Sequence, residues 1–498
     1  MLKLLKAIAT TGSASGLTLL LGLLTNKIVA VTLGPTGSGL LASYRSIHEM
    51  AAYLGTMAGP TAQVQALSSV EGEARRRRLV ACVWLTLTGM IIFSLVLLIG
   101  APLIADHFFR DSSADTVVAI RSLVITLCVA LAAVMAAGLI NVSGAIGWLA
   151  VVQICGSVAA LILAWPLATA AAGGLQLAYV GMILVPITVQ LVVAGVVCRK
   201  KGWFPSLGSA FRELPSRADL KHFTYFFIAN IGTGLVDNAS MLALRAAIIE
   251  TEGQAGNGLF QAAWMLTQHN LTLLVGVFGV YLLPLLSMQH DEGERRRVLD
   301  ETLPVIIVLT VMLAGGGLLF MPLVLRLLYS DAFLPAIEPL RWMLMANFFS
   351  ALLSTFYTLI AARGRPLISA VFNLPWYVAF AGFGISVLTG RLDVSSMGLS
   401  DLEAIGAAFF VISILRLAVQ MVLCWRLTSY VPALSVWRTG AVGFAVLIAA
   451  AWIGWSAREV DWLVSVPAAA VVCAMPLLLL NRKRLDLLRT SIRARLGR

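Results

Sequence analysis

Long apolar segments, separated by short polar ones, run along almost the whole sequence. A membrane-spanning helix needs about 20 mostly apolar residues to cross about 30 Å of hydrocarbon. By this measure the pattern predicts fourteen spanning helices joined mostly by short loops, and hence an all-α polytopic membrane protein. The predicted positions are 7–33, 40–68, 79–104, 117–139, 148–171, 175–198, 222–249, 258–288, 303–328, 338–362, 366–389, 402–427, 437–456 and 460–480.

The composition supports the same class of protein. Of the 498 residues, 59 % are hydrophobic and only 12 % are charged, whereas soluble globular proteins carry about 25 % charged residues. A soluble domain, a disordered chain and a small disulfide scaffold are all excluded by these values. The six cysteines lie within or at the ends of apolar segments and lack metal-ligand spacing, so we expect no disulfide, metal site or cofactor.

The net charge of +12 reflects the distribution of lysine and arginine over the loops. Basic blocks at 75–78, 199–201, 295–297 and 482–484 each follow an apolar segment, as cytoplasmic loops do under the positive-inside rule. Aromatic residues do not alternate with these charges, so a nucleic-acid partner is not expected. The charge bias and the even number of spans place both termini in the cytoplasm.

A basic, aromatic and proline-containing stretch at 199–221 divides the first six predicted helices from the next six, which two more helices follow. We interpret it as a cytoplasmic linker with an interfacial helix. The expected organisation is an N-lobe over 1–198, the linker over 199–221, a C-lobe over 222–430, and two further helices with a basic tail over 431–498.

The two groups of six helices repeat one another weakly. The first helix leads through Gly37-x-Gly39-Leu into the second, and the seventh leads through Gly256-x-Gly258-Leu into the eighth. Six helices separate the two motifs, so both copies run in the same direction through the membrane. Parallel repeats of this kind are typical of transporters whose substrate site lies between the lobes.

Ionisable residues within the predicted spans are the main functional signal. Each such charge costs about 2.5–3.5 kcal/mol even on the lenient insertion scale. Lys27, Arg45 and Arg245 lie roughly 8–10 Å below the outer face when depth is counted along each helix, and Arg416 lies near the middle of its span. We therefore expect these four cations to line a substrate cavity.

Three further residues could carry a coupled ion. Glu49 follows Arg45 by one helical turn, Asp237 lies two turns from Arg245, and His269 is in the eighth helix. Structural ion pairs between helices are the alternative reading for Arg45 and Glu49. A cavity with more cations than acids suits a phosphate or pyrophosphate, to which arginine makes bidentate contacts. It would repel cationic drugs.

Two stretches carry a family resemblance. The stretch NKIVAVTLGPTGSGLLASYRSI resembles the first two helices of polysaccharide repeat-unit flippases in the multidrug/oligosaccharidyl-lipid/polysaccharide (MOP) exporter superfamily. MLALRAAI and GLFQAAWMLTQHNLTLLVGVFGVYLLPLLS resemble helices seven and eight of the O-antigen and enterobacterial-common-antigen type. The resemblance implies a bilobed twelve-helix core and alternating access. Residues Lys27, Arg45 and Arg245 match the cavity cations of that family.

The same resemblance implies a substrate and a location. The substrate would be an undecaprenyl-pyrophosphate-linked oligosaccharide, moved between the leaflets of the bacterial inner membrane. Proton or sodium antiport, or the membrane potential, would drive transport, because the chain has no ATP-binding motif. The further expected partners are membrane lipids and, among proteins, a polysaccharide polymerase and a chain-length regulator. The alternatives are a lipid II flippase, a multidrug exporter of the same superfamily and, less favoured because the outer loops are short, a polymerase or ligase.

Overall fold

The computed structural model of the chain describes residues 2–56, 67, 70–202, 213–288, 291–363, 366–456 and 462–478. These residues form α-helices, short 3₁₀ and π segments and turns, which confirms the predicted all-α class. Ten of the described helices are long and apolar enough to cross a membrane. The part of the predicted linker at 203–212 and the tail after Leu478 lie outside the described residues.

Two long helices each contain a glycine break where the sequence predicts a loop. Helix α1 (Leu2–Gly55) has non-helical backbone angles at Gly34, with φ 63° and ψ −169°. Helix α8 (Arg217–Met288) has nearly the same angles at Gly253, with φ 71° and ψ −174°. A positive φ is open to glycine without steric cost. Each of these helices therefore consists of two arms, which correspond to two predicted spans.

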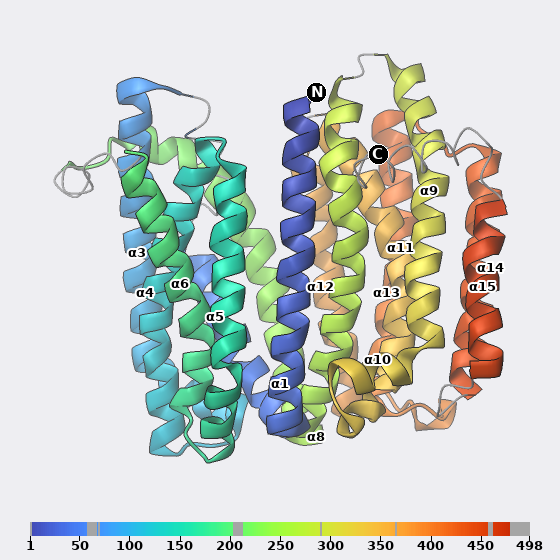
Figure 1. Ribbon diagram of the computed structural model, residues 1–498, viewed down its shortest axis with the longest axis horizontal. Helices are drawn as coiled ribbons and strands as arrows, with labels where there is room; N and C mark the ends of the chain where they lie inside the picture. The colour runs from blue at the N-terminus through green and yellow to red at the C-terminus, as the bar shows by residue number, and fades with distance from the viewer. Residues whose placement is uncertain are drawn as a thin grey trace. The chain divides into compact units, whose positions relative to one another are not determined.

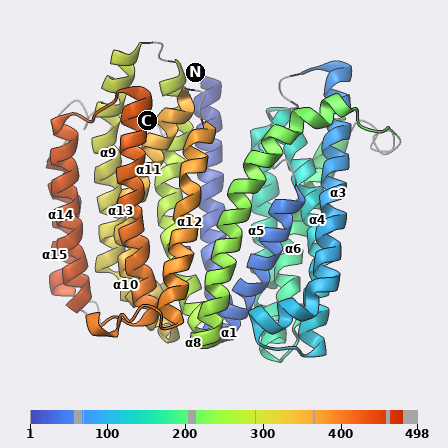
Figure 2. The ribbon, with the colours of Figure 1, turned by 180° about the vertical axis from the view of Figure 1, so that it is seen from behind.

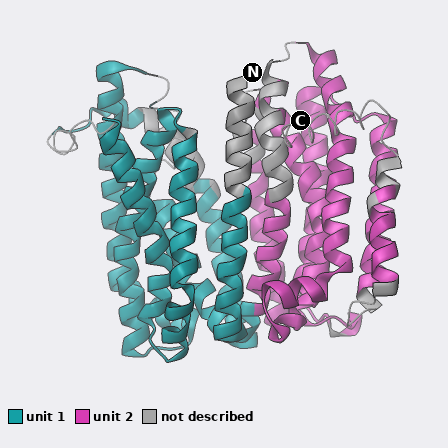
Figure 3. Cartoon of the chain, in the orientation of Figure 1, with its two compact units in different colours: residues 1–258 teal, residues 259–498 magenta. Residues whose placement is uncertain are grey.

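The chain divides into two compact units, residues 1–258 and 259–498 (Figure 3). In the first unit, α1, α3 (Gly72–Ile104), α4 (Ala114–Val142), α5 (Ile146–Ala172) and α6 (Leu177–Lys200) lie side by side (Figure 1). A π-helical turn, η1 (Ala105–Phe109), extends α3. The core of this unit is apolar and includes the buried side chains of Tyr44, Ile120, Leu123, Leu127 and Tyr179.

The second unit contains the rest of α8 and the later helices (Figure 2). These are α9 (Glu292–Leu319), α10 (Met321–Leu328), η2 (Asp331–Ala336), α11 (Ile337–Ala362), α12 (Pro366–Leu388), η3 (Ser395–Met397), α13 (Asp401–Thr428), α14 (Leu434–Ser456) and α15 (Trp462–Leu478). Helices α14 and α15 pack against α9. Close packing is possible because α14 has a glycine, Gly454, directly against the Leu318 carbonyl.

The predicted ninth span differs most from the observed helices. A single span over 303–328 is expected from hydropathy, but α9 begins at Glu292 and ends at Leu319, and α10 follows after a break at Phe320. The early start has a local cause. The Asp291 carboxylate accepts a hydrogen bond of 3.1 Å from the amide of Glu294 and so caps the helix. Hydropathy does not detect this charged first part of α9.

Candidate functional site

The second arm of α1, residues 35–55, places polar and apolar side chains on different faces. Tyr44 is fully buried in the first unit, where its ring lies 4.4 Å from that of Phe109. Arg45 is half-buried and Glu49, one turn further, is exposed. Because residues four apart share a helix face, Arg45 and Glu49 form one polar strip. Because neighbouring residues are about 100° apart around a helix, that strip lies on a different face from Tyr44.

Arg245 of α8 belongs to the same cluster as this strip. The carboxylate of Glu49 interacts electrostatically with the guanidinium groups of both Arg45 and Arg245. The side chain of Arg245 is buried, with 4 % of its surface exposed. Desolvating a charged group is costly unless it is paired and hydrogen-bonded. The cluster therefore combines two cations and one acid, with Arg45 and Glu49 on the accessible side.

Asn257 links Arg245 of α8 to the second arm of α1. Its Oδ1 accepts a hydrogen bond of 2.9 Å from Nη1 of Arg245. Its Nδ2 donates to the carbonyl of Gly39 at 2.9 Å and to the hydroxyl of Ser43 at 3.1 Å. Asn257 is fully buried, so this one amide satisfies buried polar groups of α1 and α8 together. The sequence analysis did not single out Asn257, although it lies between the two glycines of the repeated motif.

Asp237 occupies the same stretch of α8 as Arg245, closer to its start. A Cβ atom placed on Gly234 would fall 1.8 Å from Cε1 of Tyr53, so α8 touches the second arm of α1 at that point. Asp237 is half-buried and lies one turn after Gly234. Tyr53 likewise lies one turn after Glu49. We infer from this spacing that Asp237 and Glu49 lie at neighbouring levels of the first unit.

The other predicted site residues lie elsewhere in the fold. Lys27 is half-buried on the first arm of α1, seven residues before the Gly34 break. His269 and Arg416 belong to the second unit. His269 interacts with the backbone of Met265 one turn earlier in α8.

Arg416 links two helices of the second unit. Its Nη2 donates a hydrogen bond of 2.9 Å to Oδ1 of Asn373 in α12. Its guanidinium carbon also lies 5.5 Å from the ring centroid of Tyr377, in cation–π geometry. The observed contacts of Arg416 thus join α12 to α13, and its role in a cavity stays a prediction.

The cluster in the first unit can hold an anion but offers no obvious metal site. Arginine binds phosphate through two parallel hydrogen bonds, and Arg45 is partly accessible for this purpose. Among the residues that the structure describes, no three His, Cys, Asp or Glu side chains are grouped as metal ligands would be. Five cysteines of the described residues are free thiols: Cys82, Cys128, Cys155, Cys198 and Cys424.

A buried histidine of the first unit, His48, was also not singled out by sequence reasoning. His48 is 5 % exposed, and its Nδ1 lies 2.9 Å from the hydroxyl of Thr126 in α4. The contact ties the second arm of α1 to α4, on a different face from Arg45. Its neighbours Tyr44 and Ile47 are core residues, so a helical-wheel comparison could have placed His48 among them.

Comparison with known proteins identifies a family. The family model described as "Polysaccharide biosynthesis protein" matches residues 4–290, which include the whole cluster of Arg45, Glu49, Arg245 and Asn257. No curated protein matches the chain significantly.

Solved structures of transporters have the same fold. The lipid II flippase MurJ, in an inward closed conformation, is 13 % identical, with a TM-score of 0.68 over 96 % of this chain and 99 % of that one. An inward-facing multidrug resistance transporter of the MATE family is 17 % identical, with a TM-score of 0.64 over 85 % and 99 %. A MOP-superfamily transporter from Pyrococcus furiosus, described as having a binding pocket of reverse polarity, is 17 % identical, with a TM-score of 0.58 over 86 % and 95 %. The chain therefore has the fold of MOP-superfamily transporters.

Proposed function

Because the chain belongs to the polysaccharide biosynthesis protein family, we propose that it is a flippase for an undecaprenyl-pyrophosphate-linked oligosaccharide. It would carry this lipid from the cytoplasmic to the periplasmic leaflet of the bacterial inner membrane by alternating access. The distribution of lysine and arginine supports an orientation with both termini in the cytoplasm. The MOP transporter fold supports movement of a substrate across the membrane rather than chemistry on it.

One observation carries this proposal: two guanidinium groups and a single carboxylate meet in the membrane-spanning part of the first unit. Arg45 is half-buried and would contact the pyrophosphate directly. Arg245 is buried and bonded to Asn257, so it would supply positive potential and hold the helix crossing. Lys27 and Arg416 would contribute further positive charge to the path of the substrate.

Ion coupling is assigned to the acids beside these cations. Protonation of Glu49 or Asp237 would change the net charge next to Arg45 and Arg245, and hence the affinity for the pyrophosphate. His269 is a further candidate. Flipping rates of Glu49→Gln and Asp237→Asn should lose the pH dependence of the parent protein. If both variants keep the pH profile of the parent, the coupled proton is carried elsewhere or the driving ion is not a proton.

The direct test is leaflet transfer of a fluorescent polyprenyl-pyrophosphate oligosaccharide in proteoliposomes. Arg45→Ala should slow transfer about tenfold or more, since a charge-assisted hydrogen bond is lost. Arg297→Ala is the matched control, because Arg297 is a largely exposed arginine of α9 paired with Glu301, and it should transfer as the parent does. Equal transfer by Arg45→Ala and the parent would remove Arg45 from the substrate path.

Lipid II is the second candidate substrate. The match to the lipid II flippase covers 96 % of this chain, against 85 % for the inward-facing MATE transporter. The same vesicles should therefore be tested with lipid II in parallel. Faster transfer of lipid II than of other polyprenyl-pyrophosphate oligosaccharides would favour this substrate. Efflux of ethidium without lipid transfer would indicate a drug exporter.

A further inference from the structure

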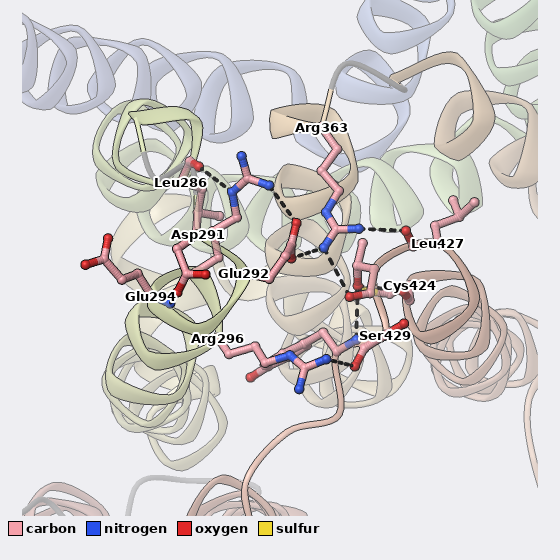
Figure 4. Close-up of polar contacts among 12 residues, drawn as sticks. Leu286, Asp291, Glu292, Glu294, Arg296, Arg363, Cys424, Leu427 and Ser429 are labelled. Carbon is pink, nitrogen blue, oxygen red and sulfur yellow. Dashed lines mark hydrogen bonds and ion pairs between the residues drawn. The ribbon is translucent and has the colours of Figure 1, made fainter.

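A cavity of about 370 Å³ lies in the second unit, where α9 begins and where α11 and α13 end. Figure 4 shows the polar contacts in this region. Arg295, Arg363 and Thr428 supply its polar lining, and Ile360, Ala362 and Leu427 supply its apolar lining. Small-molecule sites usually occupy about 300–1,000 Å³. The volume and the mixed lining therefore suit a ligand with an anionic group and an adjoining apolar part.

The side chain of Arg363, which follows α11, is held at the end of α13 by two hydrogen bonds. Its Nη1 donates to the carbonyl of Leu427 at 2.7 Å, and its Nη2 donates to the carbonyl of Thr428 at 3.1 Å. These bonds satisfy carbonyls that the helix itself leaves without a donor. Arg296 adds a third such contact from α9, with Nη2 2.7 Å from the carbonyl of Ser429. The negative end of the helix is thus already neutralised by protein groups, and it does not oppose a bound anion.

A carboxylate of the protein bridges the two arginines of the cavity. Glu292 accepts a hydrogen bond of 2.9 Å from Nη1 of Arg295 through one oxygen and pairs with Nη2 of Arg363 through the other. The arginine side chains are only 15 % and 20 % exposed, whereas that of Glu292 is 50 % exposed. The Glu292 carboxylate therefore lies between the two guanidinium groups. Of these three side chains, that of Glu292 is the most exposed.

We propose that this cavity binds a phosphate group, which replaces the carboxylate of Glu292 between Arg295 and Arg363. A phosphate offers more charge and more acceptor oxygens than a carboxylate, and arginine forks bind it in the same bidentate manner. Arg295 uses Nε for the carbonyl of Leu286, at 3.2 Å, and Nη1 for Glu292. Among the described residues, none accepts a hydrogen bond from its Nη2, which can donate to a ligand.

The residues around the cavity support a position at the level of lipid headgroups. Trp425, in the last turn of α13, is 55 % exposed and is followed by Arg426. Tryptophan and basic residues are enriched at this level of membrane proteins. The phosphate could therefore come from an anionic lipid, whose glycerol carbons would meet Ile360 and Leu427, or from a soluble phosphate.

The first unit contains a similar sequence motif beside a similar cavity. Glu71-Gly72-Glu73 stands at the start of α3 and is followed, after Ala74, by four arginines. Glu292-Gly293-Glu294 begins α9 and is followed directly by three arginines. A cavity of about 340 Å³ lies beside the start of α3 and is lined by Arg76, Arg77 and Glu73, among others. There Arg76 pairs with Glu213, again a half-exposed carboxylate. Recurrence of an arginine-lined cavity beside a repeated motif supports a shared binding role.

The experiment compares the full-length parent with Arg295→Gln, Glu292→Gln and the control Arg297→Gln. Inorganic phosphate is titrated calorimetrically into detergent-purified protein. In parallel, native mass spectrometry counts the lipids retained after extraction from nanodiscs of equal phosphatidylglycerol and phosphatidylcholine. Arg295→Gln should weaken binding about tenfold, and Glu292→Gln should tighten it by a similar factor because the competing carboxylate is removed. Arg297→Gln should match the parent.

The two readouts separate the sources of the phosphate. Enrichment of phosphatidylglycerol alone indicates a lipid headgroup, while calorimetric binding alone indicates a soluble phosphate. The proposal is overturned if the parent binds neither. It is also overturned if Arg297→Gln weakens binding as much as Arg295→Gln does, which would indicate general surface charge. None of these variants removes the cap that Arg363 provides to α13, and none tests substrate flipping, so the outcome is independent of the proposed function.

Discussion

Gly39 and Gly258 pack reciprocally, each against the backbone of the other's helix. A Cβ atom on Gly39 would lie 2.0 Å from the carbonyl oxygen of Gln254, and one on Gly258 would lie 1.9 Å from that of Pro35. Each would also come within 3.0–3.1 Å of the backbone nitrogen of the other glycine. The repeated motif thus forms a symmetric crossing of α1 and α8, next to the breaks at Gly34 and Gly253.

Alanine at either glycine should therefore destabilise the protein. We expect Gly39→Ala and Gly258→Ala each to cost about 1–3 kcal/mol, as overpacking does, because the clash is with backbone that cannot rotate away. The double variant should cost less than the sum, because both substitutions separate the same two helices. Thermal unfolding in detergent measures these effects. Gly195→Ala is the control, since a Cβ there meets nothing within 4 Å, and it should unfold at or above the parent temperature.

The sequence predicted this crossing only in part, and the reason is physical. Glycine spacing and hydropathy are local properties, so the repeat and the spans of α1 and α8 could be recognised. Hydrogen-bond partners such as Asn257 and Gly39 are far apart in the chain and become visible only when the helices cross. For the same reason the sequence could predict that Arg245 is a charge in the membrane but not that it is buried.

Replacing Asn257 should weaken the crossing without a steric clash. Asn257→Ala leaves the Arg245 guanidinium and the Gly39 carbonyl without the bonds that the amide provides, at a cost of about 1–3 kcal/mol for each buried group. Asn257→Asp keeps an acceptor for Arg245 but cannot donate to Gly39, so it should lose less. Thermal unfolding of both variants checks this order. Equal stability of Asn257→Ala and the parent would contradict a structural role for the network.

A loop of the first unit should give a pH-dependent contribution to stability. The hydroxyl of Thr116 donates a hydrogen bond of 2.5 Å to the carboxylate of Asp111, which also accepts from the amide and hydroxyl of Ser113. These bonds, that of Thr116 above all, lower the pKa of Asp111 below its usual 3.8. Because the pKa of Asp111 is lower in the folded than in the unfolded protein, its ionised carboxylate stabilises the fold when the pH is above the unfolded-state pKa. This stabilisation is lost as the pH falls through the folded-state pKa.

Asp111→Asn measures that contribution. The parent should unfold at a higher temperature than Asp111→Asn at pH 6, and the difference should shrink as the pH drops below about 4. Thr116→Val provides the second comparison, because it removes the main cause of the lowered pKa and should move the loss of stability to higher pH. A difference between the parent and Asp111→Asn that stays constant from pH 6 to pH 3 would contradict the assignment.

Replacing one member of the buried ion pair between α11 and α13 should destabilise the protein more than replacing both members does. Nη2 of Arg341 lies 2.5 Å from Oε1 of Glu403, and both side chains are at most 10 % exposed. Trp342 also donates to Glu403, at 3.1 Å. Glu403→Ala leaves a buried guanidinium without its carboxylate, which should cost about 3–5 kcal/mol. Replacing both charges by apolar residues removes two desolvation costs together with the attraction between the charges.

The double variant Arg341→Met/Glu403→Leu should therefore recover most of the loss. Glu338→Ala is the matched control on α11. Its carboxylate is exposed and accepts a hydrogen bond of 2.6 Å from Ser400, so its removal should cost less than about 1.5 kcal/mol. Thermal unfolding of the four proteins completes the comparison. If the double variant is less stable than Glu403→Ala, the pair contributes more through its attraction than it costs in desolvation, and the expected order is wrong.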